Sequence, residues 1–320
     1  MDVWMNKPYD VVIIGTGLVG SSLALALTKH RLRVALVEQR LLPVHPPVER
    51  GASKPIALNY ASVAILKNLG LWSKVAAQAS PIQTVHISEQ GTLASTQIQS
   101  QALGVTALGQ TVPAAQLGWA FTQSLQQALT QGKLDIWNPA VCQRLSPHPC
   151  GWAITIQTET TQQTIEATLV IATDGAGSTA RQLMDIPVEK EKTLSSHQQA
   201  LVTTLHTTQP HNQIAYQRFT QQGILAFLPL VNKNRVGFIW TASTAVIESL
   251  TQLNDAAFLS QVQSLFPKRL GTFYAKEALQ THPLEMFMAK PQAQPGFILL
   301  GNAAHTPLPI AAQGVELSFT

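Results

Sequence analysis

The chain has 320 residues, of which 45% are hydrophobic and only 12% are charged. This composition excludes a disordered protein and allows a core large enough for two lobes. The formal net charge of +4 is small, and no run of lysine and arginine has aromatic neighbours, so nucleic-acid binding is not expected. Two cysteines favour a reducing compartment, and the short segment between Cys142 and Cys150 predicts that they could touch across a hairpin.

An apolar stretch near the start needs an explanation other than a membrane span. Residues 11–27 give 17 positions that include three glycines and two serines, and Asp10 precedes them. A spanning helix needs roughly 20 predominantly apolar residues, and a signal peptide carries positive charge at that place. The stretch therefore predicts a cytosolic protein.

The same stretch contains a glycine-rich turn between a strand and a helix. Residues 9–14 (YDVVII) are typical of a buried parallel strand, and residues 15–20 (GTGLVG) follow at once. A helix is predicted over 18–30 and a second strand over 33–38, which ends in an acid. This strand–turn–helix–strand order is the context that a dinucleotide-binding fingerprint requires.

Each position of the turn has a physical role in that fingerprint. Gly15 permits the tight turn, Gly17 lets the backbone approach a pyrophosphate, and Gly20 lets the helix pack closely on the strand. Leu18 and Val19 begin the helix, whose unpaired N–H groups would face the phosphates.

Glu38 ends the second strand, 18 residues after Gly20. A carboxylate there would accept hydrogen bonds from ribose hydroxyls, which argues against a 2′-phosphate at this position. The alternative is an ordinary βαβ unit in which the acid is simply solvated.

A second motif lies in the middle of the chain. Residues 169–173 (LVIAT) predict another buried strand, which runs into Asp174-Gly175 and then Ser178 and Arg181. This segment resembles the DGxxSxxR signature of the class A flavoprotein monooxygenases, the single-component aromatic hydroxylases.

A third motif lies near the end. Gly301-Asn302 and the loop over 309–314 resemble the corner and flavin loop of the same family. Residues 218–230 (RFTQQGILAFLPL) look like the ubiquinone-biosynthesis branch of that family. Within this branch, 266–271 (FPKRLG) and Asn302 lean toward the 2-polyprenyl-6-methoxyphenol hydroxylases.

The resemblance covers nearly the whole chain and implies a set of site residues. FAD would contact the following residues: Gly15, Gly17, Leu18, Val19, Gly20, Glu38, Lys54, Asp174, Gly175, Arg181, Gly301, Asn302 and Gly314. Catalytic roles would fall beside the flavin ring, on His305, Pro309 and Gln313, although a lone histidine more often bonds a loop carbonyl. No metal site is predicted, because His206 and His211 have no acid or cysteine cluster nearby in the sequence.

The resemblance also implies an α/β fold. A Rossmann-like FAD-binding lobe of the GR2 type, with a mainly parallel sheet and helices, would comprise 1–80, 105–186 and 290–320. A smaller substrate lobe with a mixed β-sheet would comprise 81–104 and 187–289. Alternating, strand-like sequence patterns at 84–92 and 224–242 support the second lobe. Helices are predicted over 113–131 and 255–265.

The second lobe offers apolar residues that would form a wall beside the flavin. These residues are Ile224, Leu225, Phe227, Leu228, Trp240, Met286, Phe287 and Met288. Such a wall would suit a ring-bearing substrate with an apolar tail. The alternative is ordinary sheet core, and for any single residue that alternative is the better one.

The implied activity is hydroxylation of the aromatic ring of a polyprenylphenol in ubiquinone biosynthesis. The family uses FAD, NAD(P)H as co-substrate and O2, and transfers oxygen through a C4a-hydroperoxyflavin. The implied location is the cytoplasm, with peripheral contact with the inner membrane and with other ubiquinone-biosynthesis proteins left open.

Several residues depart from the family pattern. Lys54 stands where the family has a flavin-facing arginine, and Glu316 would place a carboxylate near an anionic flavin. The chain also stops at Thr320, where the family continues with a long helix, so the resemblance implies a C-terminally shortened member. The alternatives are therefore a catalytically impaired FAD-binding scaffold in a ubiquinone-biosynthesis complex and, less favoured, a flavin reductase or dehydrogenase.

Overall fold

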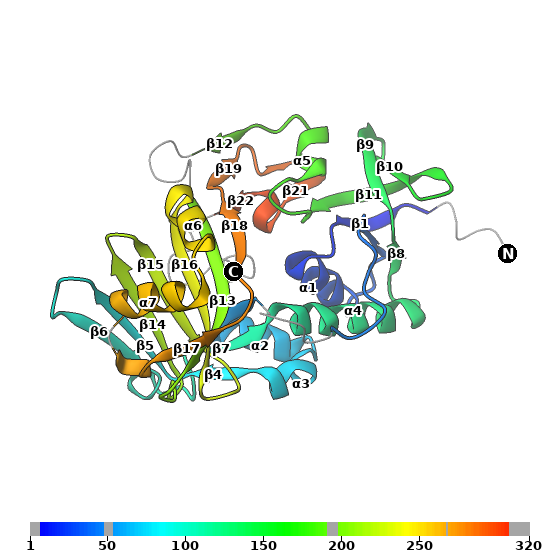
Figure 1. Ribbon diagram of the computed structural model, residues 1–320. Helices are drawn as coiled ribbons and strands as arrows, with labels where there is room; N and C mark the ends of the chain where they lie inside the picture. The colour runs from blue at the N-terminus through cyan, green and yellow to red at the C-terminus, as the bar shows by residue number, and fades with distance from the viewer. Residues whose placement is uncertain (1–6, 48–53, 191–197, 267, 307–320) are drawn as a thin grey trace.

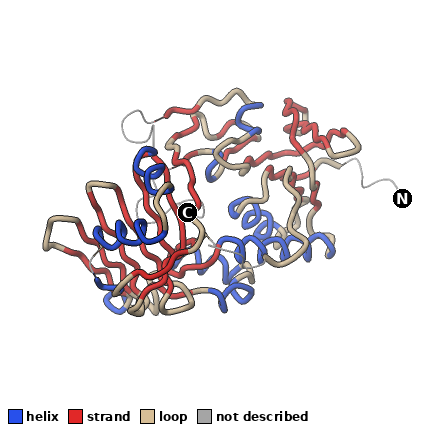
Figure 2. Tube along the Cα trace, viewed as in Figure 1, coloured by secondary structure: helices blue, strands red, loops and turns tan. Residues whose placement is uncertain are grey.

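A computed structural model describes residues 7–47, 54–190, 198–266 and 268–306. Two large sheets lie at opposite sides of the molecule, and most of the helices pack on one or the other (Figure 1). The first sheet contains the N-terminal strand, and the second is built mainly from the middle of the chain. Figure 2 shows the strands of both sheets in red, with the helices in blue packed beside them.

The first sheet is parallel at its centre. Its parallel strands, in spatial order, are β21 (Phe297–Leu299), β11 (Gln162–Ala172), β1 (Tyr9–Ile14), β2 (Val34–Val37) and β8 (Asp135–Trp137). β1 and β2 are short β-branched runs buried on both faces, as strands covered by helices must be. The carboxyl ends of β1 and β11 lie side by side, because Ile14 pairs with Ala172.

Antiparallel strands extend this sheet at its edges. β11 is 11 residues long, and its first half pairs with β10 (Gly151–Gln157), which pairs in turn with β9 (Val141–His148). A short strand, β20 (Ala293–Gln294), pairs with β21. The strand predicted over 169–173 is therefore only the carboxyl end of a longer strand that also supports a hairpin.

Helices cover the first sheet, and a small sheet lies beside them. The helices are α1 (Leu18–Leu27), α2 (Tyr60–Asn68), α3 (Trp72–Val75), α4 (Ala114–Thr130) and α5 (Thr179–Leu183), with 3-10 turns at η1 (Ala76–Gln78) and η4 (Gly301–Ala303). The small sheet has the order β3 (Pro55–Asn59), β7 (Gly109–Pro113) and β4 (Ser80–Ile82). Capping side chains start two of the helices: Asn59 accepts from the Ser62 N–H, and Ser178 accepts from the Arg181 N–H.

The second sheet is mostly antiparallel. Its strands, in order, are β17 (Phe273–Lys276), β13 (Gln198–Thr207), β16 (Arg235–Ser243), β15 (Gly223–Pro229), β14 (Ile214–Thr220), β5 (Thr84–Glu89) and β6 (Ser95–Gln99), and β18 (Gln280–Leu284) also pairs with β13. α6 (Thr244–Thr251) and α7 (Asp255–Leu265) cover one face, and turns η2 (Gln101–Leu103) and η3 (Lys268–Leu270) complete it. The largest fully buried side chains there are aromatic: Phe227, Phe238, Trp240 and Phe258.

A three-stranded sheet carries the chain between the two large ones. Its order is β12 (Val188–Lys190), β19 (Phe287–Ala289) and β22 (His305–Thr306). Segments that are far apart in sequence therefore meet in this sheet, and β22 contacts the η4 turn that begins at Gly301.

The predicted α/β class is confirmed, with one mainly parallel and one mainly antiparallel sheet. The helix predicted over 255–265 has those bounds, whereas the helix predicted over 18–30 ends at Leu27. The lobe boundaries stay a proposal, which is supported by the pairing of β5 and β6 with the second sheet.

The prediction that the two cysteines could touch across a hairpin was wrong. Cys142 pairs with Ile156 on β10, whereas Cys150 lies in the turn, and both thiols are free.

The apolar stretch 11–27 divides into β1 and α1. Among the helices of the described residues, none has the length and apolar character that crossing a membrane requires.

A tight contact joins β1, α1 and β11. A Cβ on Gly20 would lie 2.1 Å from the Gly15 carbonyl oxygen and 2.3 Å from Thr173 Oγ1. Thr173 Oγ1 donates to the Ile14 and Gly15 carbonyl oxygens at 3.0 and 2.9 Å. Gly15 itself has φ +99°, and a Cβ there would lie 2.8 Å from Asp174 Cα. Only glycine fits at both positions. The residues that follow β11, Thr173 and Asp174, therefore help to impose the glycine requirement on the turn after β1.

Arg181 joins the second and third sequence motifs. It is 7% exposed, and its guanidinium donates to the carbonyl oxygens of Ala176 at 2.7 Å and Ala303 at 2.8 Å. Its Cζ lies 4.8 Å from the centroid of the Phe287 ring. The side chain therefore fastens the loop after β11 to the turn after β21, and both segments border the site described below.

We expect Gly20→Ala to lower the free energy of unfolding by about 1–3 kcal/mol, because the added methyl group overlaps backbone and Thr173. Gly118→Ala, in the interior of α4 with no atom within 4 Å of the new Cβ, should instead raise it by about 0.5–1 kcal/mol. Urea unfolding followed by circular dichroism measures both. Equal effects of the two substitutions would contradict the packing argument.

We expect Arg181→Lys to destabilise the protein by about 2–3 kcal/mol, because one ammonium cannot reach both carbonyl oxygens and stack on Phe287. Arg144→Lys, on the exposed face of β9, is the matched control and should change stability by less than about 0.5 kcal/mol. Chemical denaturation measures both, and a silent Arg181→Lys would show that the clamp contributes nothing.

Candidate functional site

The first component of the site is the amino end of α1. Its N-cap, Gly17, is extended, no side chain caps it, and no acid occupies the first turn. A Cβ on Gly17 would meet no atom closer than the Thr173 carbonyl oxygen at 3.9 Å. The free N–H groups and the open space before them suit a diphosphate, since a helix amino terminus attracts anions.

Glu38 lies beside this turn, and its predicted contact with a ribose hydroxyl stays a prediction. One carboxylate oxygen accepts from the Thr16 N–H at 2.8 Å and from the Thr16 hydroxyl at 2.7 Å, and the other accepts from the Arg40 N–H at 2.7 Å. A carboxylate has about four acceptor positions, so one remains for a hydroxyl donor. Glu38 thus also holds the glycine turn in place, a role that the sequence did not indicate.

The second component of the site is the loop between β11 and α5, which includes Asp174. Its Oδ2 accepts from the Ala180 N–H at 3.0 Å, whereas Oδ1 is buried and has no hydrogen-bond partner. A buried acceptor without a donor is costly. A hydroxyl from a bound group would satisfy Oδ1, and Cβ atoms on Gly175 and Gly177 would meet nothing within 4 Å, so this loop is open to such a group. The residues of both components therefore fit a dinucleotide.

The third component is the turn after β21. Gly301 has φ +58°, and Asn302 is exposed and borders a cavity. His305 is half-buried in β22 and pairs with Met288. Three predicted flavin-loop residues lie outside the described residues: Pro309, Gln313 and Gly314.

A cavity of about 610 Å³ lies between these loops and the second sheet. Lys54 and the first residues of β3 border one side, Ala176, Gly177 and Asn302 border another, and β13 to β16 and β18 form the remainder. The second motif, through Ala176 and Gly177, and the third, through Asn302, therefore border one volume large enough for a drug-sized molecule.

Pleat direction decides which residues of the second sheet line the cavity. Ile224 and Ala226 on β15 and Ile239 on β16 face it. Leu225, Phe227 and Trp240, which were predicted in the wall, are instead 0% exposed in the core beneath α6 and α7. The prediction was wrong for these three because β15 and β16 carry apolar residues on both faces, so sequence alternation could not identify the cavity face.

The other predicted wall residues divide in the same way. Met286 borders the cavity, whereas Phe287 packs against Arg181 and Met288 is exposed. Leu228 lies in a small core with Ala57. Only Ile224 and Met286 of the predicted wall therefore line the cavity.

The polar and charged residues on the cavity border are Lys54, Gln217, Thr241, His282, Glu285, Asn302 and Thr306. Gln217 is buried, and Lys54 is exposed. His282 has a lowered pKa, mainly because of burial and secondarily because of the nearby positive charge of Lys54. Sequence reasoning missed Gln217 and His282, since neither belongs to a motif and only the folded sheet brings them to this border.

The two histidines that were considered as a metal pair are separated in the fold. His211 accepts from the Gln213 N–H at 3.0 Å and bonds the Leu230 carbonyl oxygen at 2.8 Å. His206 lies 3.9 Å from the carboxylate of Glu277, the residue after β17. Each imidazole makes contacts of its own with neighbouring groups.

Comparison with known proteins agrees with this geometry. The family model described as FAD binding domain matches residues 8–320. The 3-demethoxyubiquinol 3-hydroxylase of Escherichia coli is 31% identical over 319 residues, which cover 98% of this chain and 78% of that protein. Ubiquinone hydroxylase UbiL of Rhodospirillum rubrum is 28% identical, covering 97% of this chain and 70% of that protein.

A solved structure extends the likeness to three dimensions. PqsL of Pseudomonas aeruginosa in complex with 2-aminobenzoylacetate superposes with a TM-score of 0.76 at 19% identity, covering 98% of this chain and 83% of that one. At this identity the likeness shows the fold alone. The family match and the sequence relatives go further, and the chain belongs to the FAD-dependent class A monooxygenases of the ubiquinone-biosynthesis hydroxylase family.

Proposed function

We propose that this protein hydroxylates the aromatic ring of a polyprenylphenol intermediate of ubiquinone biosynthesis, with FAD as cofactor and NAD(P)H and O2 as co-substrates. The observation that carries the proposal is the position of the cavity. It is bordered on one side by Ala176, Gly177 and Asn302 of the FAD motifs and on the other by apolar residues of the second sheet. A ring held there would lie next to the cofactor.

FAD would be held at three places. The amino end of α1, with Gly15, Gly17, Leu18, Val19 and Gly20, would face the diphosphate, and Glu38 would accept from a ribose hydroxyl. Bound FAD supplies the electron transfer and oxygen activation that side chains cannot perform.

The second and third motifs would face the rest of the cofactor. Asp174 has a buried oxygen available for a hydroxyl donor, and Gly175 leaves open space beside it. Arg181 would act indirectly, because its guanidinium is bonded to two carbonyl oxygens and positions the Gly301-Asn302 turn.

The cavity residues would select and orient the substrate. Ile224, Ala226 and Ile239 give an apolar surface that suits a ring with a hydrocarbon tail and excludes water from the reacting atoms. Gln217 and His282 offer polar atoms at the cavity border that can hydrogen-bond a phenol hydroxyl, and the lowered pKa of His282 favours the neutral imidazole. Membrane contact and association with other ubiquinone-biosynthesis proteins stay predictions of the resemblance.

The decisive experiment is the spectrum and turnover of the purified protein. We expect bound oxidised flavin, bleaching by NAD(P)H, and incorporation of one oxygen atom from ¹⁸O2 into a short-chain polyprenylphenol. A protein that binds FAD but neither consumes NAD(P)H nor hydroxylates the phenol would be the scaffold instead. NAD(P)H oxidation without ¹⁸O in the phenol would indicate a reductase.

We expect Glu38→Ala to weaken FAD binding by about 10–100-fold, because a charged acceptor for the ribose is lost. Gln39→Ala, at the exposed neighbouring position, is the control and should bind FAD normally. Fluorescence titration of the apoprotein with FAD measures both. Thr16→Val removes the hydroxyl contact with Glu38, so a loss equal to that of Glu38→Ala would assign the effect to the turn alone.

We expect Ala226→Trp to leave FAD binding intact and to lower kcat/KM for the phenol by at least about tenfold, because an indole on β15 fills part of the cavity. Ala94→Trp, at an exposed loop position, should leave turnover unchanged. Steady-state kinetics with FAD content measured in the same samples tests this. Normal turnover by Ala226→Trp would place the substrate elsewhere.

A further inference from the structure

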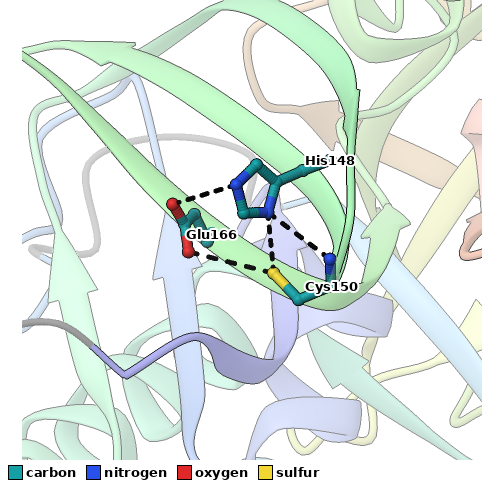
Figure 3. A group of neighbouring side chains, drawn as sticks. All are labelled: His148, Cys150 and Glu166. Carbon is teal, nitrogen blue, oxygen red and sulfur yellow. Dashed lines mark hydrogen bonds and ion pairs between the residues drawn. The ribbon is translucent and has the colours of Figure 1, made fainter.

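Three potential metal ligands meet at the β9–β10 hairpin (Figure 3). They are His148 at the end of β9, Cys150 in the turn, and Glu166 on β11. One ligand atom from each residue lies within 4.8 Å of the other two, and all three residues are half-buried. The hairpin is on the side of the first sheet away from the second sheet, so the cluster is not part of the cavity described above.

The backbone brings these side chains together through Gly151. This residue has φ +132°, and a Cβ on it would lie 2.4 Å from the Ala167 carbonyl oxygen and 2.7 Å from that of Thr168. Only glycine lets the turn lie directly on β11 in this conformation. The turn is therefore held against the strand that carries Glu166, and the three side chains are preorganised by two strands and a turn.

The contacts within the cluster define its chemistry. His148 Nδ1 lies 2.9 Å from Cys150 Sγ and accepts weakly from the Cys150 N–H at 3.5 Å. His148 Nε2 lies 3.4 Å from Glu166 Oε1, and Cys150 Sγ lies 3.8 Å from Glu166 Oε2. Sulfur, imidazole nitrogen and carboxylate oxygen thus converge from three residues on one small volume.

We propose that His148, Cys150 and Glu166 bind a borderline divalent cation of the zinc class. Thiolate, imidazole and carboxylate are the ligands that Zn²⁺ takes in proteins, whereas Mg²⁺ and Ca²⁺ take oxygen. Side-chain exposures of 34% for His148 and 40% for Glu166 leave a path for the ion and room for water as a fourth ligand. Binding replaces the thiol proton: the Cys150 S–H bond breaks, the sulfur–metal bond forms, and one proton is released to solvent.

The other cysteine supplies an internal control. Cys142 lies on the same hairpin but is buried, and burial raises the pKa of its thiol to about 12. Its sulfur lies in the hydrophobic core and 3.9 Å from the Arg144 carbonyl oxygen. Cys142 is not among the clustered ligand atoms, so its substitution should not affect metal binding.

The test is calorimetric titration of the full, untagged protein with ZnCl2 in two buffers of different protonation enthalpy. We expect about one equivalent of Zn²⁺ to bind, with about one proton released. Cys150→Ser, His148→Ala and Glu166→Gln should each weaken binding by at least about 10–100-fold. Cys142→Ser should bind as the unaltered protein does.

X-ray absorption identifies the ligands directly. We expect one sulfur at about 2.3 Å, with nitrogen and oxygen at about 2.0–2.1 Å. Binding that persists when all three residues are replaced would place the ion elsewhere and overturn the proposal. Absence of stoichiometric uptake, or a bound ion without a sulfur neighbour, would overturn it as well. None of these outcomes depends on FAD binding or on hydroxylase activity.

Discussion

The site depends on the close approach of three backbone segments: the turn after β1, the first turns of α1, and Thr173 after β11. Gly20 packs against the Gly15 carbonyl oxygen, and Thr173 bonds the same turn from the other strand. This contact fixes the amino end of α1 at the carboxyl edge of the parallel strands. It also sets the position of Asp174, the next residue of the chain, so the first and second motifs are one structure.

Charged side chains hold the neighbouring loops in place. Glu38 fixes the glycine turn through Thr16, and Arg181 fixes the Asp174 loop to the Gly301 turn through two carbonyl oxygens. Both are residues that a family signature would assign to a ligand. In this fold their first effect is on the protein itself, since a loop that carries binding groups must be held in place before it can bind well.

The cavity belongs to the junction of the two sheets. β3 and the loops of the first sheet border one side, and the pleated face of β15 and β16 borders the other. Aromatic residues of the opposite face are packed beneath α6 and α7, so the cavity face is free to carry smaller side chains such as Ala226. The cavity-facing surface is thus supported by a packed aromatic core on the opposite face of the sheet.

What the sequence by itself determined is local and periodic. The β-branched runs of β1 and β2, the glycine turn with Glu38, and the helix over 255–265 all depend on neighbours within a few residues or one turn. The family resemblance added the fold class, because spaced motifs preserve the order of the elements. These features needed no knowledge of which strands pair.

Only the tertiary structure decided what depends on pairing and pleat. Both faces of β15 are apolar, so alternation could not say that Ala226 rather than Phe227 faces the cavity. Cys142 and Cys150 are close in sequence but lie in different environments, because the register places Cys142 opposite Ile156 and the Gly151 turn carries Cys150 to Glu166 on β11. A single residue of register turns a side chain to the other face of a sheet, and the chain reveals that choice only when it folds.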